Sequence, residues 1–246
     1  MTNTKQNQQL NDMPSLKTQG NDIIALFAKA GLGAVPFVGS VFAEVAGAII
    51  PNQRVDRIVK FAQKLESKLS DTQKAALRSQ LSDEEFVGIL EDGMIQASKS
   101  TSDDRREYLA SLIANGLSDK AIEYSETRRL LTILGDLSDA EVIFLRSYLV
   151  RTIGGDEEFR EKHKKLLRHD PIALNASQEE NDKNAIKDNY KEHLISLGLL
   201  KNEYRLSHET GLQEIDTFTK APKISGKNIT GTGRLLLRYI GLSETT

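Results

Sequence analysis

The chain has 246 residues, of which 39% are hydrophobic and 28% are charged, a balance typical of a folded protein of one or two domains rather than a disordered chain. Its 33 basic and 35 acidic residues give a formal net charge of −2, which excludes a uniformly basic nucleic-acid coat but not a local basic patch. The lack of cysteine excludes disulfides and thiolate metal sites.

The N-terminal region is predicted to be a polar arm followed by an apolar helical hairpin. Residues 1–21 are polar and rich in Asn and Gln, so we expect a flexible arm. Residues 23–50 are almost entirely small or apolar, and only Lys29 and Glu44 carry charge. Because Pro36 removes a helical hydrogen bond near the middle, we expect two antiparallel arms joined by a short turn.

The hairpin also contains a ridge of small residues. Gly39, Ala43 and Gly47 recur every four residues, which lets another helix pack closely. If the arms fold back on each other, Lys29 and Glu44 face one another and neutralise their charges. Three interpretations stay open: a hairpin packed in a soluble core, which we favour, a hairpin that leaves the core to enter a membrane, and a permanent span. Neither arm reaches the ~20 residues that one span requires.

Residues 22–135 are predicted to form a helical domain. From residue 55 onward apolar residues recur at helical spacing, and Leu112 is among those that we expect to be buried. Capping residues and glycines divide the region into separate helices. The predicted starts and stops are Ser82, Ser102, Gly116, Ser118 and Gly135.

Residues 136–246 are predicted to form a winged-helix-like domain. A capping box, Ser138 with Glu141, opens one helix, and a charged helix follows over 156–168. A third helix ends at Gly198 and precedes two short strands and a closing helix. This order is that of a winged helix-turn-helix with a two-stranded wing. The fold class is therefore mostly α.

Several stretches of the chain resemble the bacterial abortive-infection alpha family. They are "RREYLASLIANGLSD" from Arg105, "RRLLTILGDLSDAEVIFLRSYL" from Arg128, the Leu-Gly-Leu of residues 197–199, and "TGTGRLLLRYIGL" from Thr230. In that family a helix end, at Asn115 here, precedes an acidic helix start and a winged-helix-like tail. The resemblance covers about residues 105–242. It implies a role in phage resistance and implies no enzymatic activity.

No catalytic or cofactor motif stands out. The four histidines lack metal-ligand spacing, and none belongs to an HExxH pattern. Gly31-Leu32-Gly33 lacks the third glycine of a dinucleotide site, and Gly226-Lys227 lacks the earlier glycine of a P-loop. We therefore expect a protein that is not an enzyme and has no metal or cofactor.

A nucleic-acid interface is the main alternative. Between Thr217 and Ser243 the chain has basic residues and no acidic one, so a wing of this charge could follow phosphates. The candidate contacts are Lys220, Lys223, Lys227, Arg234 and Arg238. The third helix is near neutral, since Asp182, Asp188 and Glu192 accompany Lys183, Lys187 and Lys191; its apolar face is expected to contain Ile186, Tyr190, Leu194 and Leu197.

These observations predict a bacterial interaction and defence module that acts through a protein partner or through membrane insertion of residues 23–50. The alternative is a DNA-binding winged-helix regulator that uses the basic wing. Self-association stays open. We expect a cytoplasmic protein, with membrane association only if the hairpin inserts.

Overall fold

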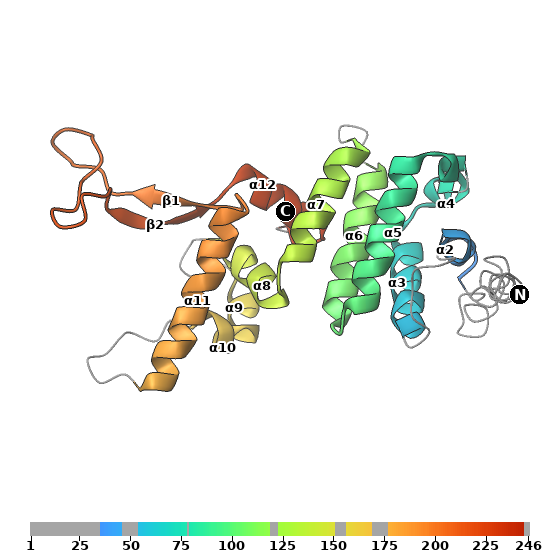
Figure 1. Ribbon diagram of the computed structural model, residues 1–246, viewed down its shortest axis with the longest axis horizontal. Coiled ribbons are helices and arrows are strands. Elements are labelled where there is room, and N and C mark those ends of the chain that lie inside the picture. The colour runs from blue at the N-terminus through green and yellow to red at the C-terminus, as the bar shows by residue number, and fades with distance from the viewer. Residues whose placement is uncertain are drawn as a thin grey trace, which may run out of the picture. The chain divides into compact units, whose positions relative to one another are not determined.

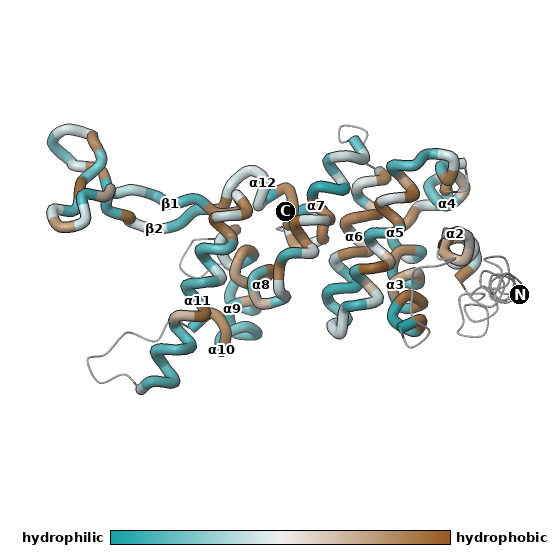
Figure 2. Tube along the Cα trace, in the orientation of Figure 1, coloured by the Kyte–Doolittle hydropathy of each residue, from teal (hydrophilic) through white to brown (hydrophobic). Residues whose placement is uncertain are grey.

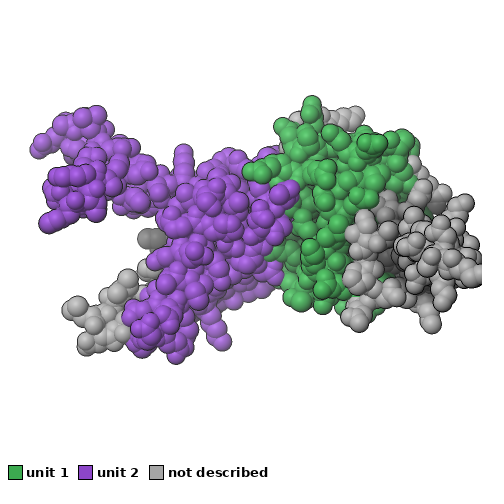
Figure 3. Space-filling model, in the orientation of Figure 1, with its two compact units in different colours: residues 1–131 green, residues 132–246 purple. Residues whose placement is uncertain are grey.

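The computed structural model describes residues 35–45, 54–77, 79–118, 123–150, 156–168 and 177–243. The chain divides into two compact units, residues 1–131 and 132–246 (Figure 3). The predicted domain boundary, between residues 135 and 136, lies close to this division. The described residues form eleven α-helices and a two-stranded antiparallel sheet near the C-terminal end (Figure 1). The predicted fold class, a helical array followed by helices with a short wing, is confirmed.

The first unit is an array of helices that share one apolar core. Helix α3 packs against α5 and α6, which also pack against each other, and α2 lies against α3 and α5 (Figure 1). The elements are α2 (Val38–Val45), α3 (Val55–Lys68), α4 (Asp71–Leu77), the 3-10 turn η3 (Ser79–Ser82), α5 (Glu84–Lys99), α6 (Asp103–Ser118) and α7 (Tyr124–Asp136), which crosses the division between the units.

The core of this unit is built from apolar residues at helical spacing, as the sequence predicts. The rings of Phe42 on α2 and Phe61 on α3 lie 5.5 Å apart between centroids. Leu112 on α6 is fully buried, which confirms its predicted position. Burial of a side chain of this size stabilises the fold by about 1.5–3 kcal/mol. Others in the core include Ile58, Leu65, Phe86, Ile89, Leu90, Met94, Leu109 and Ile113.

Helix α2 is anchored by a carboxylate from another helix. The side chain of Glu66 on α3 accepts hydrogen bonds from the backbone N–H groups of Val38, at 2.8 Å, and Phe37, at 3.3 Å. Such N–H groups have no partner within their own helix, and a negative charge at a helix N-terminus is favourable. A residue 28 positions away in the sequence therefore caps this helix.

Part of the predicted apolar hairpin lies in the described residues. Helix α2 follows the predicted turn at residues 35–37, with Gly39 buried and Ala43 partly buried on it. Within the described residues no helix combines the length and apolar character needed to cross a membrane. The predictions that fall outside the described part concern Lys29, Gly47 and the side chain of Glu44. The hairpin and its ion pair stay predictions.

Three of the predicted helix boundaries in this unit, at Ser82, Gly116 and Ser118, are wrong, and the one at Ser102 is confirmed. The cap of α5 is Asp83 rather than Ser82, because Ser82 still belongs to the 3-10 turn and Asp83 accepts the first-turn N–H groups. Helix α6 does not stop at Gly116 but continues to Ser118, which therefore ends a helix instead of opening one. The hydroxyl of Ser102 does cap α6, at 3.2 Å from the N–H of Arg105.

Gly116 has a packing role instead of a terminating one. A Cβ added at this position would lie 2.4 Å from Cγ2 and 2.7 Å from Oγ1 of Thr127 on α7. Both residues are buried. The glycine therefore permits the close approach of α6 and α7.

The second unit has the element order of a winged helix. Helix α11 packs against α8 and against β1, and the two strands pair antiparallel from Leu200 opposite Ile229 to Tyr204 opposite Ile224. The predicted charged helix is in fact two short helices separated at His163. The elements are α8 (Asp139–Ser147), α9 (Glu157–Lys162), α10 (Lys164–Leu167), α11 (Gln178–Ser196), β1 (Leu200–Tyr204), β2 (Ile224–Ile229) and α12 (Gly231–Tyr239).

The junction between α11, the wing and α12 requires two glycines. Gly198 ends α11 with φ of 71°, a left-handed conformation that favours glycine. The hydroxyl oxygen of Thr230 caps α12 by accepting the N–H of Gly233, at 3.0 Å. A Cβ on Gly233 would lie 2.4 Å from the carbonyl oxygen of Leu199. The side chain of Thr230 also donates to the carbonyl oxygen of Gly198 at 2.7 Å, so it holds α12 against the start of the wing.

The capping box of α8 extends to α11. Glu141 accepts the backbone N–H of Ser138 at 2.7 Å, and Ser138 in turn caps the helix, as predicted. The other carboxylate oxygen of Glu141 lies 2.6 Å from Nδ1 of His193 on α11. The side chain of Glu141 is only 7% exposed. One buried carboxylate therefore both starts α8 and joins it to α11.

Gly116→Ala tests the close approach of α6 and α7. Overpacking should destabilise the protein by about 1–3 kcal/mol, partly offset by the ~1 kcal/mol that alanine gains over glycine in a helix. With Thr127→Ala the added methyl group has room, so most of the penalty should disappear. Chemical denaturation of both single variants and the double variant measures this coupling. A coupling within about 0.5 kcal/mol of zero would contradict the contact.

Acid should weaken the link between α8 and α11. Burial raises the pKa of Glu141, but hydrogen bonds from Ser138 and His193 outweigh it and hold that pKa below its ordinary value. The carboxylate therefore stabilises the fold above about pH 4.3, and this contribution is lost as pH falls through the lowered pKa.

Glu141→Gln should therefore flatten the acid limb of the stability profile measured by denaturation at a series of pH values. Glu158→Gln, at an exposed position of α9, is the matched control and should leave that limb unchanged. Equal acid limbs for the unmodified protein and Glu141→Gln would show that this contact contributes nothing.

Candidate interaction surface of the wing

The segment between β1 and β2 is a three-way junction rather than a simple loop. Three residues spaced nine apart, Arg205, Glu214 and Lys223, close a ring of backbone hydrogen bonds. The N–H of Arg205 donates to Lys223 at 2.8 Å, that of Lys223 donates to Glu214 at 2.8 Å, and that of Glu214 donates to Arg205 at 2.9 Å. Two lobes leave this junction, a first lobe of residues 206–213 and a second of residues 215–222 (Figure 1).

The two lobes repeat one backbone pattern. In each, the second residue, Ser207 or Asp216, donates its N–H to the carbonyl oxygen five residues later, at 2.8 and 2.9 Å. Its own carbonyl oxygen accepts the N–H four residues later, from Gly211 or Lys220, at 2.9 and 3.0 Å. These last two residues have φ of 68° and 57°, so both turns pass through the left-handed region at the same position.

Side chains close the turn of each lobe from inside. The hydroxyl of Ser207 accepts two backbone N–H groups at 3.3 and 3.4 Å. In the second lobe Asp216 accepts the N–H groups of Phe218 and Thr219, both at 2.9 Å. These hydrogen bonds hold the pKa of Asp216 below its ordinary value. The lobes therefore have a defined backbone although they have no apolar core.

The outer surface of this segment is unusually apolar. The side chain of Phe218 is 94% exposed and that of Leu212 is 70% exposed. We define the wing tip as residues 204–224. It carries six of the eight exposed large hydrophobic side chains in the described part of the chain. Figure 2 shows hydrophobic residues in both lobes. Such a concentration of exposed apolar groups marks interaction surfaces. The other four in the wing tip are Tyr204, Leu206, Ile215 and Ile224.

The five predicted nucleic-acid contacts do not form one cluster of available charges. Lys220 is exposed in the second lobe, and Arg234 and Arg238 are exposed on α12. Lys223 is paired with Glu214 at 3.6 Å within the wing tip. Lys227, on β2, donates to Glu192 of α11 at 2.8 Å, so its ammonium group links the wing to that helix.

The exposed face of α11 is acidic, so the expectation of a near-neutral helix is wrong for its surface. Lys187 is buried and the side chain of Lys191 is only 16% exposed. Lys183 is exposed, and it is bonded to Glu179. Ile186 is exposed as well, although the sequence places it on the apolar face. The exposed carboxylates of α11 belong to Glu179, Glu180, Asp182, Asp188 and Glu192.

The nine-residue repeat of the lobes leaves only a weak signal in the sequence. Leu206 and Ile215, Ser207 and Asp216, and Thr210 and Thr219 are all nine apart. Two copies of a short turn give a weak pattern, because Ser and Asp serve the same capping role with different letters. Only the matching hydrogen bonds make the repeat evident.

Comparisons with protein-family models, with curated proteins and with solved structures each found no match. The resemblance of residues 105–242 to the abortive-infection alpha family therefore stays a prediction. The geometry of the wing tip and the charge of α11 are the physical basis for a functional proposal.

Acid should loosen the second lobe and leave the first intact. Because the pKa of Asp216 is lowered, its contribution is present above its ordinary value, about 3.9, and is lost as pH falls through the lowered pKa. Ser207 does not titrate in this range. The backbone amide proton shifts of Phe218 and Thr219 should therefore move in an NMR titration from about pH 6 to pH 2, and by more than that of Leu212, whose N–H donates to the hydroxyl of Thr210 in the first lobe.

Asp216→Asn provides the control for this titration, since it should remove the pH dependence at Phe218 and Thr219. Amide shifts that move equally in both lobes of the unmodified protein would contradict the assignment of Asp216 as the titrating cap.

Proposed function

We propose that this chain is a non-enzymatic interaction module that binds a protein partner through its wing tip and acts in bacterial phage defence. The observation that carries the proposal is the set of exposed apolar side chains on a hydrogen-bonded backbone. The defence setting is supported by the resemblance of residues 105–242 to the abortive-infection alpha family.

The energetics of the wing tip favour a protein partner. Burial of an exposed side chain of the size of Phe218 or Leu212 contributes about 1.5–3 kcal/mol. Aromatic residues that enter a pocket on the partner commonly dominate the binding energy. The ring of hydrogen bonds at the junction keeps the lobes ordered before binding, which lowers the entropy lost on association.

The charges of the wing tip indicate the kind of surface that it fits. Arg205 and Lys220 are exposed there and outnumber the one exposed carboxylate, that of Glu209, while the carboxylates of Glu214 and Asp216 are already bonded within the tip. A complementary partner offers an apolar contact bordered by carboxylates.

DNA binding is the second candidate, and the exposed Lys220, Arg234 and Arg238 favour it. The acidic face of α11 opposes it, because a winged helix places this helix in the major groove, where the phosphates of both strands are close. Membrane insertion of residues 23–50 and binding of a second copy are further alternatives. Liposome flotation and gel filtration of the full chain distinguish them from a protein partner.

A photo-crosslinking residue at position 218 tests the proposal in bacterial cells that express the full chain. We expect a discrete protein adduct from p-benzoylphenylalanine in place of Phe218. The matched control is the same residue in place of Ile186, which is 53% exposed on α11 and should give no such adduct.

Function is tested with Phe218→Ser and Leu212→Ser combined, measured as the efficiency of phage plating and as affinity for the crosslinked protein once purified. Loss of a central apolar contact should weaken binding about 30-fold, equivalent to about 2 kcal/mol. Ile186→Ser should keep both activities. Unchanged plating and affinity in the double variant would refute the wing tip as the binding surface. Salt-sensitive duplex binding that Lys220→Glu with Arg234→Glu abolishes would favour the DNA alternative.

A further inference from the structure

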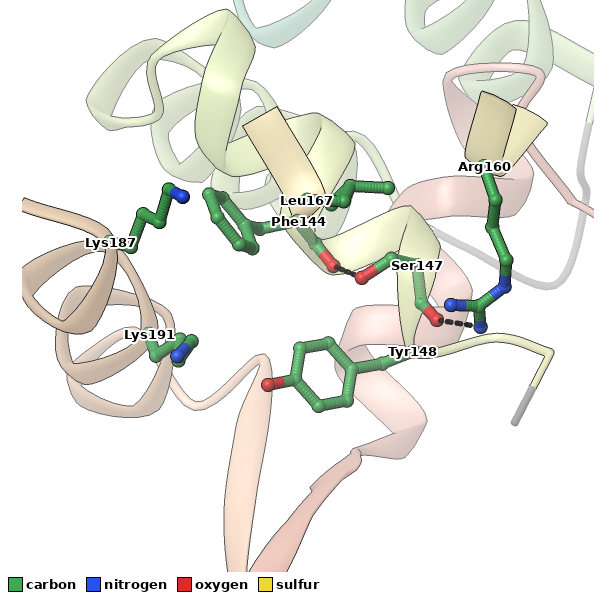
Figure 4. A pocket seen from close by; sticks show the side chains of 7 residues that line it. All are labelled: Phe144, Ser147, Tyr148, Arg160, Leu167, Lys187 and Lys191. Atoms are coloured by element: carbon green, nitrogen blue, oxygen red, sulfur yellow. Dashed lines mark hydrogen bonds between the residues drawn. The ribbon is translucent and has the colours of Figure 1, made fainter. Parts of the chain in front are cut away.

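The second unit contains a cavity of about 310 Å³ between α8, α9, α10 and α11 (Figure 4). This volume is at the lower end of the range for small-molecule sites. The cavity lies among helices and takes no residue from the wing tip. Its lining residues are Phe144, Ser147, Tyr148, Arg160, Leu167, Lys187 and Lys191.

Lys187 is a buried cation that faces this cavity. The residue is only 9% exposed, and its ammonium group donates to the backbone carbonyl oxygen of Arg168 at 2.6 Å. An ammonium group has three N–H donors, and among the described residues no carboxylate pairs with Lys187. Burial of a charge without an opposite charge is costly, so a bound anion would be favourable at this position.

Lys191 lies one helical turn further along α11, on the same side as Lys187. Its ammonium group is 2.9 Å from Asp188, whose side chain is largely exposed. In Figure 4 the two lysine side chains lie on one side of the cavity, and the hydroxyl end of Tyr148 points toward Lys191. Among the described residues, none that lines the cavity is acidic. Of the three cationic residues in the lining, Lys187 and Lys191 therefore lie on one side of the cavity, and Asp188 balances part of the charge of Lys191.

The opposite side of the cavity is largely apolar. Phe144 and Tyr148 supply aromatic rings, and Leu167 adds an aliphatic side chain. The guanidinium of Arg160 donates to the carbonyl oxygens of Val150, at 2.7 Å, and Ser147, at 3.4 Å, and so lies at the edge of the site. The cavity combines a cationic side with an aromatic side.

We propose that this cavity binds a small organic phosphate, a monoester whose phosphate contacts Lys187 and Lys191 and whose apolar or aromatic group lies against Phe144 and Tyr148. A phosphate monoester carries up to two negative charges, which matches the two ammonium groups better than a single carboxylate does. The aromatic rings provide the apolar contact that a free phosphate ion cannot use. This site is independent of the partner proposed for the wing tip.

Titration calorimetry of the full chain with four ligands tests the assignment. Phenyl phosphate combines both features; inorganic phosphate, benzoate and phenol each lack one of them. We expect phenyl phosphate to bind most tightly. Tightest binding of benzoate would overturn the assignment to phosphate in favour of a carboxylate, and absence of heat with any phosphate at millimolar concentration would overturn the site.

Lys191→Met should weaken phenyl phosphate binding by about tenfold or more, as expected for loss of a charge-assisted hydrogen bond. The matched control is Lys183→Met, on the exposed face of the same helix, which should bind as the unmodified protein does. Circular dichroism and thermal unfolding check that each variant is folded. Equal affinity of Lys191→Met and Lys183→Met would overturn the proposal. Lys187→Met is informative only if folded, so Lys191→Met carries the test.

Discussion

The ring of backbone hydrogen bonds that joins Arg205, Glu214 and Lys223 is the constraint on which the wing depends. A hairpin of this length has little core, and an isolated two-stranded hairpin is marginally stable in water. Here the backbone N–H and C=O groups bond to one another within two similar consecutive turns, and a capping side chain closes each turn. Because the backbone does not need its apolar side chains for stability, those side chains stay on the surface and are available for a partner.

Helix α11 distributes its charges in the opposite way to a typical surface helix. Lys187 and Lys191 face inward, and the carboxylates of the helix face solvent. This distribution has two consequences. The exposed face of α11 becomes acidic, which disfavours binding of nucleic-acid phosphates there. The side of α11 that faces α8 becomes basic, which favours binding of an anion in the cavity. The carboxylate of Glu192 also holds Lys227 of the wing, so the acidic face contributes to placement of the strands.

Close backbone approach recurs at the joints of both units. Gly116 lets α6 approach Thr127, and Gly233 lets α12 approach the carbonyl of Leu199. Glu66 and Glu141 connect helices that are far apart in the sequence. The carboxylate of Glu66, on α3, caps α2, and that of Glu141 caps its own helix α8 and contacts His193 on α11. These contacts explain why helices that are short by themselves keep defined positions within each unit.

The sequence by itself determined the helical fold class, the burial of Leu112, and the capping box of Ser138 and Glu141. These features depend on residues within one or two turns of each other, so periodicity and capping rules suffice to predict them. Tertiary structure decided that Gly116 packs instead of ending a helix, because its partner Thr127 lies on another helix. It also decided which lysines of α11 turn inward and which basic residues of the wing are already paired. Burial and pairing depend on groups brought together from distant positions, and no local pattern records them.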